Sequence, residues 1–294
     1  MANDLAKVKT TAFTSFSEAL AAAPLGALAA CRLITTDTAN LSLGTGIGTG
    51  TWSVAGATEA SPTDIDTVKV ELASVNFEIV EMIKWHDIND NPDIVAQRAA
   101  LLANRGAATI RDAVSTGILG LFTLAHPMEL DRGILAGTKY IDGSIEFDGG
   151  PATQSNLLGA AALSQSTFAT ARKTLRGYKG QDGVVLGMGE RVKLIVGEDH
   201  ADVAYEIANS GVTSAALQAS ANKAGVSDVV VIPGLSTKWF MADEVNNPLI
   251  AWMRKMPQID VRESATGLGV TLAGTATFTF GVTASEAGIV GANF

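Results

Sequence analysis

VKVEL at residues 68–72, FEIVEMIKW at residues 77–85 and DNPDIVAQRAALLANRGAATIRDAVS at residues 90–115 form the stretch that decides the fold. In the first segment apolar and polar residues alternate, which is the period of a half-buried strand. The second segment is also extended. The third contains the start and body of a long helix, around which the rest of the chain is organised.

Asn91, Pro92 and Asp93 form the expected start of this helix. Asn91 can cap it, Pro92 suits a first turn whose N–H groups lack partners, and Asp93 favours the positive end of the helix dipole. The helix is predicted to run from Pro92 to about Ser115, a length of roughly 36 Å. Its expected apolar side consists of Val95, Ala99, Leu102, Ile110, Val114 and Ile118.

The composition indicates a globular chain with a weakly polar surface. The 294 residues are 47% hydrophobic, which is ample for the core of one large domain or two modest ones. Only 17% of residues are charged and 6% are aromatic, so small residues must cover much of the surface. Such surfaces occur where a protein is buried against copies of itself, and also in large enzymes. The net charge of −9 argues against a surface that binds nucleic-acid phosphates.

Cysteine use and hydropathy exclude further classes. Cys31 is the only cysteine, which excludes an intrachain disulfide and a multi-cysteine metal site and favours a small buried apolar role. No stretch approaches the roughly 18 apolar residues of a membrane-spanning helix. The apolar residues 19–31 are interrupted by Pro24 and Gly26, so we interpret them as an N-terminal helix or arm and not as a signal sequence. A reducing cytoplasm is the expected folding compartment.

Residues 35–67 form a tract rich in Thr, Gly, Ser and Ala. Apolar residues alternate with serine at 41–43 and 52–54, which predicts two short strands around the glycine-rich tip at residues 44–50. An isolated hairpin of this kind is marginal in water, so the tract is either disordered or packs on something else. A phosphate-binding loop is disfavoured, because no Lys-Ser/Thr pair follows the glycines.

The remainder mixes helices and strands without regular alternation, which is typical of an α+β fold. Ser164 is predicted to cap a helix that ends at Gly177, with Phe168, Ala171 and Leu175 on its buried face. A second helix is expected from Asp199 to Ser210, with inward positions Ala201, Ala204, Tyr205 and Ala208. Strands are expected at residues 139–141, 144–147, 184–186, 192–196, 228–233, 238–242, 258–262 and 269–282.

The sequence nominates no catalytic, cofactor-binding or metal-binding residue. His86, His126 and His200 lie far apart and match no metal-ligand spacing. The acidic run at residues 87–93 differs from a calcium loop, since Pro92 stands where a glycine is needed and Arg98 where the bidentate Glu belongs. An enzyme without a local motif remains one alternative, because many active sites have no sequence signature.

The order of features is more specific than any single motif. The telling segments are residues 76–80, 87–90 and 93–117, then 142–148 and 155–158, then 168–173, 182–186, 192–196, 204–207, 229–232 and 239–243. This series resembles the Mu-type major head protein family of tailed-phage major capsid proteins. Two features depart from the family pattern: a second aromatic and a histidine near Phe147 are missing, and residues 35–67 match only in position and composition.

The resemblance implies the Hong Kong 97-like shell fold. Its parts would be an N-terminal arm at residues 1–34, an extended loop at 35–67, a peripheral domain at 68–183 with the spine helix, an axial domain at 184–256, and return strands of the peripheral domain at 257–294. The implied function is structural. Copies of the chain would assemble as hexamers and pentamers into an icosahedral virion shell around double-stranded DNA, without sequence-specific binding, in the host cytoplasm.

The implied partners are other copies of the chain, a portal, and scaffold or decoration proteins, with no cofactor and no membrane. An encapsulin-like compartment with the same fold is the alternative shell. Four residues are candidates for subunit interfaces. Ile47 and Trp52 are apolar anchors in the extended loop, or else a local hairpin cluster. Phe13 and Phe16 tie the arm to a neighbouring subunit, or else pack on their own subunit.

Overall fold

A computed structural model of the protein describes residues 2–23, 26–37, 40–45, 68–73, 75–122, 158–178, 185, 189–209, 225–282 and 288–292. The helices are α1 (Ala2–Ala22), α2 (Trp85–Asp90), α3 (Ile94–Gly120), α4 (Gln165–Arg176) and α5 (Ala201–Asn209), with 3₁₀ turns η1 (Gly26–Ala30) and η2 (Glu198–His200). The strands are β1 (Arg32–Thr35), β2 (Asn40–Thr45), β3 (Val68–Ala73), β4 (Val75–Lys84), β5 (Val192–Val196), β6 (Val226–Val231), β7 (Trp239–Asp243), β8 (Leu249–Glu263), β9 (Gly269–Val282) and β10 (Ile289–Ala292).

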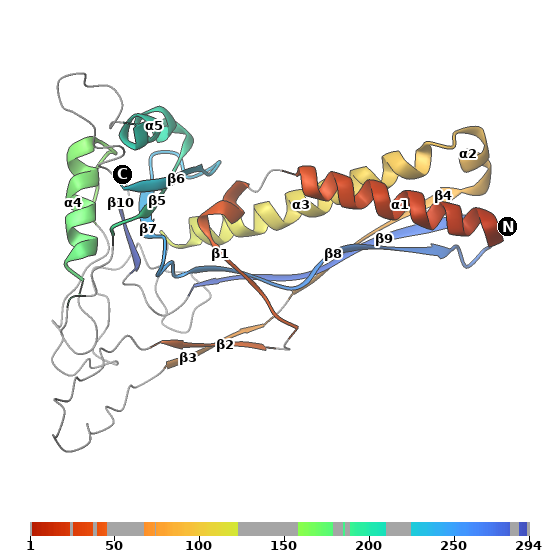
Figure 1. The fold of residues 1–294 in the computed structure, drawn as a ribbon, viewed down its shortest axis with the longest axis horizontal. Helices are drawn as coiled ribbons and strands as arrows, with labels where there is room; N and C mark the ends of the chain where they lie inside the picture. Colours follow the sequence, from red (N-terminus) through yellow and green to blue (C-terminus); the bar gives the residue numbers. More distant parts are fainter. Residues whose placement is uncertain are drawn as a thin grey trace, which may run out of the picture.

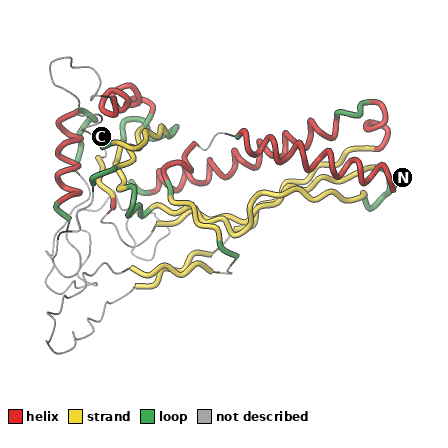
Figure 2. Tube along the Cα trace, in the orientation of Figure 1, coloured by secondary structure: helices red, strands yellow, loops and turns green. Residues whose placement is uncertain are grey.

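The described residues form an elongated molecule with two unlike ends (Figure 1). At one end α1 and α3 lie side by side along one face of a long sheet with strand order β1-β8-β9-β4. At the other end α4 and α5 pack on a smaller sheet of order β10-β7-β5-β6. A separate ribbon, β2-β3, lies on the side of the long sheet away from the two long helices (Figure 2). This mixture confirms the predicted α+β class.

The predicted spine helix is α3. Its buried residues include all six positions expected from the sequence: Val95, Ala99, Leu102, Ile110, Val114 and Ile118. The side-chain oxygen of Asn91 accepts a hydrogen bond from the backbone N–H of Asp93 at 3.2 Å, and helical geometry begins two residues after Pro92. The helix continues to Gly120 instead of ending near Ser115, because Gly117 lies against Phe280 of β9 and is a packing position, not a stop.

The N-terminal segment is a helix, one of the two forms that the sequence left open. Val8, Ala12 and Phe16 recur every four residues and are buried together with residues of α3, β8 and β9. The chain then passes through η1 into β1, which pairs in parallel with residues 250–253 of β8. α1, η1 and β1 are therefore an integral part of the long sheet and its helical layer.

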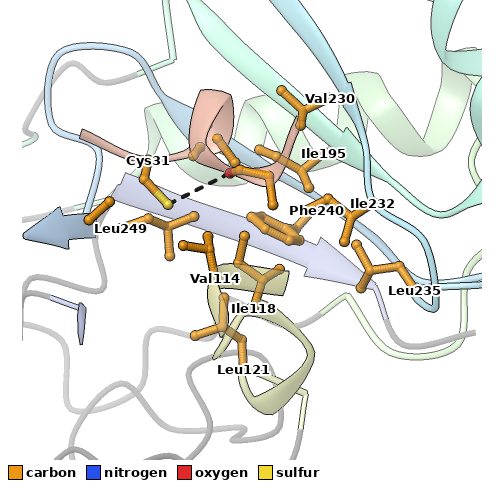
Figure 3. Packing of buried hydrophobic residues seen from close by; sticks show 14 of the residues in the cluster. Cys31, Val114, Ile118, Leu121, Ile195, Val230, Ile232, Leu235, Phe240 and Leu249 are labelled. Atoms are coloured by element: carbon orange, nitrogen blue, oxygen red, sulfur yellow. Dashed lines mark hydrogen bonds between the residues drawn. The ribbon is translucent and has the colours of Figure 1, made fainter. Parts of the chain in front are cut away.

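One apolar cluster connects the two ends of the molecule (Figure 3). Val114, Ile118 and Leu121 near the end of α3 pack in the same cluster as Ile195 and Phe240 of the smaller sheet. All five side chains are buried. Full burial of such a side chain contributes about 1.5–3 kcal/mol, so the cluster makes the junction stable.

Polar contacts hold η1 at this junction. The Lys193 ammonium donates a hydrogen bond to the carbonyl oxygen of Ala29 at 2.7 Å, and the Asn247 side-chain amide donates one to the carbonyl oxygen of Ala30, also at 2.7 Å. Carbonyl groups at the end of a helix lack hydrogen-bond partners in the helix itself, and these two side chains supply them. Cys31, next in the chain, is buried as predicted.

The smaller sheet carries α4 and α5 on one face. Ser164 and Thr167 form a capping box at the start of α4, and Phe168, Ala171 and Leu175 are buried, as the sequence predicted. In α5, Ala204 and Ile207 are buried. The prediction that Tyr205 points inward is wrong, because its exposed fraction is 49% and the helix turns Ile207 toward the sheet.

The strand pairing goes beyond the sequence predictions in three places. β2 pairs with β3, with Leu41 opposite Leu72 and Leu43 opposite Val70, whereas the predicted partner segment at residues 52–54 lies outside the described residues. β8 is a single strand from Leu249 to Glu263, longer than the predicted strand at residues 258–262, and it passes Pro257 through two register shifts. β10 joins the smaller sheet as an edge strand. The predicted strands at 139–147 lie outside the described residues.

Candidate assembly surfaces

Phe13 and Phe16, three residues apart on α1, differ in burial. Phe16 is buried, and its ring lies near Gly274 of β9, so it packs on its own subunit, the second of the two roles left open by the sequence. Phe13 has an exposed fraction of 63% and lines a hollow of about 400 Å³ with Thr10 of α1 and Ile259 of β8. Of these two residues, Phe13 is therefore the one that presents its apolar ring on the surface.

The β2-β3 ribbon is the base of the predicted extended loop. Six residue pairs join the strands, from Asn40 opposite Ala73 to Thr45 opposite Val68. The ribbon forms a sheet of its own among the described strands. A two-stranded ribbon is marginal in water. The candidates Ile47 and Trp52 lie beyond it, outside the described residues.

One face of the long sheet is not covered by the two long helices. Along β4, Glu81 points to the helical side, where its carboxylate pairs with Arg98 of α3 at 2.8 Å, and Ile83 is buried there. The alternate residues Val80 and Met82 are exposed. The uncovered face contains a shallow hollow of about 430 Å³ lined by Val80 and by residues of β8 and β9. β4 is also an edge strand.

The buried carboxylate of Asp243 holds the turn that follows β7 through three hydrogen bonds. One oxygen of Asp243 accepts a hydrogen bond from the N–H of Gly189 at 2.8 Å, and the other accepts from the N–H groups of Val245 at 3.2 Å and Asn246 at 2.8 Å. Bonds to an ionised acceptor are among the stronger hydrogen bonds in proteins. They hold Val245 on the surface with 76% of its area exposed. Leu268, 69% exposed, occupies the turn between β8 and β9.

Opposite charges collect on the two helices of the smaller sheet. α4 contains Arg172, Lys173 and Arg176 and no acidic residue, whereas η2 and α5 contain Glu198, Asp199, Asp202 and Glu206. Burial, and secondarily the nearby Arg176, lower the pKa of the Arg172 guanidinium. Its Nε and Nη2 donate hydrogen bonds to the carbonyl oxygens of Gly189 and Glu190 at 2.8 and 2.9 Å.

The described residues contain no group of three or more His, Cys, Asp or Glu side chains placed to hold a metal ion. No helix within the described ranges is long and apolar enough to cross a bilayer. His86 lies on the surface beside Asp87, and His126 is outside the described ranges. The candidate assembly surfaces of the described residues are the exposed apolar side chains, the uncovered sheet face and the two charged helices.

The sequence nominated only Phe13 among these surfaces. The sequence does indicate a covered position for Val80 and Met82. Apolar residues occur at both alternating sets of positions in β4, as expected for a strand that is covered on both faces. Val245 and Leu268 have no such signal, because each is a lone apolar residue in a turn.

Comparison with known proteins places these surfaces in context. A family model described as "Phage capsid protein" matches residues 74–291, which run from the residue before β4 almost to the end of β10. No curated protein sequence matches the chain.

Solved structures similar to this chain come from several particles. The capsid of an empty GTA particle is 13% identical, with a TM-score of 0.56 over 92% of this chain and 89% of that one. The capsid of the cyanophage P-SCSP1u is 8% identical, with a TM-score of 0.53 over 90% and 86%. A virus-like particle from Pyrococcus furiosus is 10% identical, with a TM-score of 0.52 over 96% and 97%. At these identities the likeness establishes the shared fold.

Proposed function

Since this chain belongs to the phage capsid protein family, we propose that it is the repeating subunit of a closed icosahedral phage head that encloses double-stranded DNA. The observation that carries the proposal is the family match over residues 74–291. That range contains the spine helix, most of the long sheet and nearly all of the smaller sheet. Its role in the shell is structural, and the surfaces described above are the places where copies would meet.

The two sheets support a division into two domains. The peripheral domain would comprise α1, α3 and the long sheet, and the axial domain would comprise α4, α5 and the smaller sheet. This keeps the division predicted from the sequence but moves β8 wholly into the peripheral domain and β10 into the axial domain. The apolar cluster around Phe240 would then be the interdomain core.

The extended loop at residues 35–67 is proposed to lie across a neighbouring subunit. The β2-β3 ribbon that forms its base supports this, because a two-stranded ribbon gains stability when it packs on another surface. Ile47 and Trp52 would be its apolar anchors. Aromatic residues are enriched among the side chains that contribute most to interfaces.

The acidic balance of the chain is compatible with a shell that confines DNA. With a net charge of −9, the subunit would not bind phosphates tightly, so packaged DNA would remain free to leave. Hexamers and pentamers, a portal, scaffold or decoration proteins, assembly in the host cytoplasm and membership of the Mu-type subfamily all remain parts of the proposal.

An encapsulin-like compartment is the alternative shell, and the contents of the particle distinguish the two. Particles purified from cells that produce the intact virus would be treated with nuclease and then opened. A phage head protects long double-stranded DNA of uniform length. Particles that contain only protein cargo would contradict the proposal.

A further inference from the structure

The charged helices α4 and α5 lie at opposite edges of the same sheet face. α4 packs against β10 and α5 packs against β6, which are the two edge strands of the smaller sheet. Phe168 of α4 and Ile207 of α5 belong to one apolar cluster with Leu194 of β5, so both helices cover the same face. Three strand spacings, about 14 Å, separate the two edges.

The acidic side is a regular stripe. Asp202 and Glu206 are four residues apart in α5, so they lie on one side of that helix, and Glu198 precedes them by four residues in η2. All three are exposed. Among the described residues, none of them forms a salt bridge, and residues 197–209 contain no lysine or arginine. We call these three residues the acidic stripe.

The basic side is a smaller patch on α4. Lys173 and Arg176, three residues apart, are exposed, and neither forms a salt bridge with another described residue. Arg172 is held by backbone carbonyls and adds positive charge behind them. Like charges at such spacings on a helix destabilise it by a few tenths of a kcal/mol per pair. α4 contains no acidic residue that would offset this repulsion. We call Lys173 and Arg176 the basic patch.

The placement of the two surfaces distinguishes between two ways of pairing copies of this chain. A twofold contact at either helix places a surface against its own copy, and like charges then oppose each other. A head-to-tail contact places the basic patch of one copy against the acidic stripe of the next. When the rotation between neighbours closes, this contact generates a ring.

We propose that the basic patch of one subunit binds the acidic stripe of the next subunit, head to tail, and that this contact sets the order of subunits within each ring of the shell. The inference rests on the proposed shell-forming function and identifies the partner surface. Charge complementarity of this kind mainly speeds association and suppresses wrong pairings. Since both sides are exposed, the contact should also weaken as salt screens it.

Charge reversal tests the contact. The first variant combines Asp202→Lys with Glu206→Lys, and the second combines Lys173→Glu with Arg176→Glu. Each alone opposes like charges and should lower the yield of rings about tenfold or more, as measured by analytical ultracentrifugation. Reversal of both surfaces in one chain should restore ring formation.

A mixture of the two variants gives the sharpest test. Each variant can bind only the other, so rings must alternate and contain an even number of subunits. Negative-stain microscopy should show six-membered rings and no five-membered rings, and therefore no closed shells. Wild-type protein in the same buffer should form both.

A charge-matched control is Lys7→Glu on α1 with Arg105→Glu on α3, where both residues are exposed and lie outside the hollow beside Phe13. Circular dichroism and the thermal midpoint confirm that each variant folds. In wild-type protein, ring dissociation should increase between 50 mM and 1 M NaCl. If the wild type forms rings and both single-surface variants do so equally well, the inference is wrong. If the two variants fail alone and remain unassembled when mixed, it is also wrong. Failure of the wild type itself would count against the proposed function.

Discussion

A Cβ atom on Gly117 would lie 2.6 Å from Cε1 and 2.8 Å from Cγ of Phe280, so the spine helix α3 passes over β9 with no room for a side chain at residue 117. This close approach occurs beside the apolar cluster that connects the two sheets, against which Phe280 packs. It makes the position of α3 relative to the long sheet depend on one glycine.

The Gly117→Ala variant should be less stable by about 1–3 kcal/mol, because the added methyl group displaces the Phe280 ring in a packed region. The measurement is the free energy of unfolding from chemical denaturation of the unassembled subunit. The Phe280→Ala exchange should remove most of this penalty when the two are combined. Strict additivity of the two changes would contradict the proposed contact.

Gly106 in the same helix supplies the matched control. A Cβ atom there meets nothing within 4 Å. Alanine is favoured over glycine in a helix interior by about 0.5–1 kcal/mol, so Gly106→Ala should stabilise the subunit.

The Cys31 thiol should be unreactive in the native subunit. Burial raises its pKa from 9.0 to about 12, although the nearby Lys193 acts in the opposite direction. Since the folded state holds the proton more tightly, the thiol's contribution to stability is complete below pH 9.0 and is lost as the pH rises toward about 12. At pH 8, a thiol reagent should label Cys31 only after unfolding. Rapid labelling of the native subunit would contradict its buried position.

Phe13 and Phe16 form a matched pair for separating folding from assembly. Phe16→Ala removes a buried ring and should cost about 3–5 kcal/mol in the free energy of unfolding. Phe13→Ala changes an exposed side chain, so stability should change by less than about 0.5 kcal/mol. If Phe13 contacts a neighbour, the second variant should instead lower the yield of particles. Equal effects of both variants on stability would contradict the difference in burial between Phe13 and Phe16.

Trp52→Ala should leave the fold intact and weaken shell assembly, because Trp52 is proposed to anchor the extended loop on a neighbouring subunit. Circular dichroism of the subunit and the particle yield in sedimentation are the two readouts. A wild-type particle yield would favour the alternative, a local hairpin cluster.

Local signals in the sequence were sufficient for α3 and α4, but they missed α2, since residues 77–85 were predicted to be extended throughout. The apolar side of α3 and the Ser164 cap of α4 follow from residues three or four positions apart, whose interactions do not depend on distant parts of the chain. The side of α1 that is buried was also readable from Val8, Ala12 and Phe16.

Distant pairings were harder to predict. The partner of β2 is β3, more than twenty residues along the chain, and alternation in β2 cannot specify which strand it will meet. β8 passes Pro257 through register shifts that a proline tolerates, and the predicted strand at residues 258–262 covers only its later part. The charged helices could be listed from the sequence, but their places at opposite edges of one sheet face depend on the strand order β10-β7-β5-β6.

The most direct test of the shell-forming function is light scattering coupled to size exclusion on the recombinant chain, with negative-stain microscopy of the peak fractions. We predict rings of subunits or closed shells with a mass many times that of the 30.3 kDa chain. A compact monomer or dimer under all assembly conditions would contradict this function.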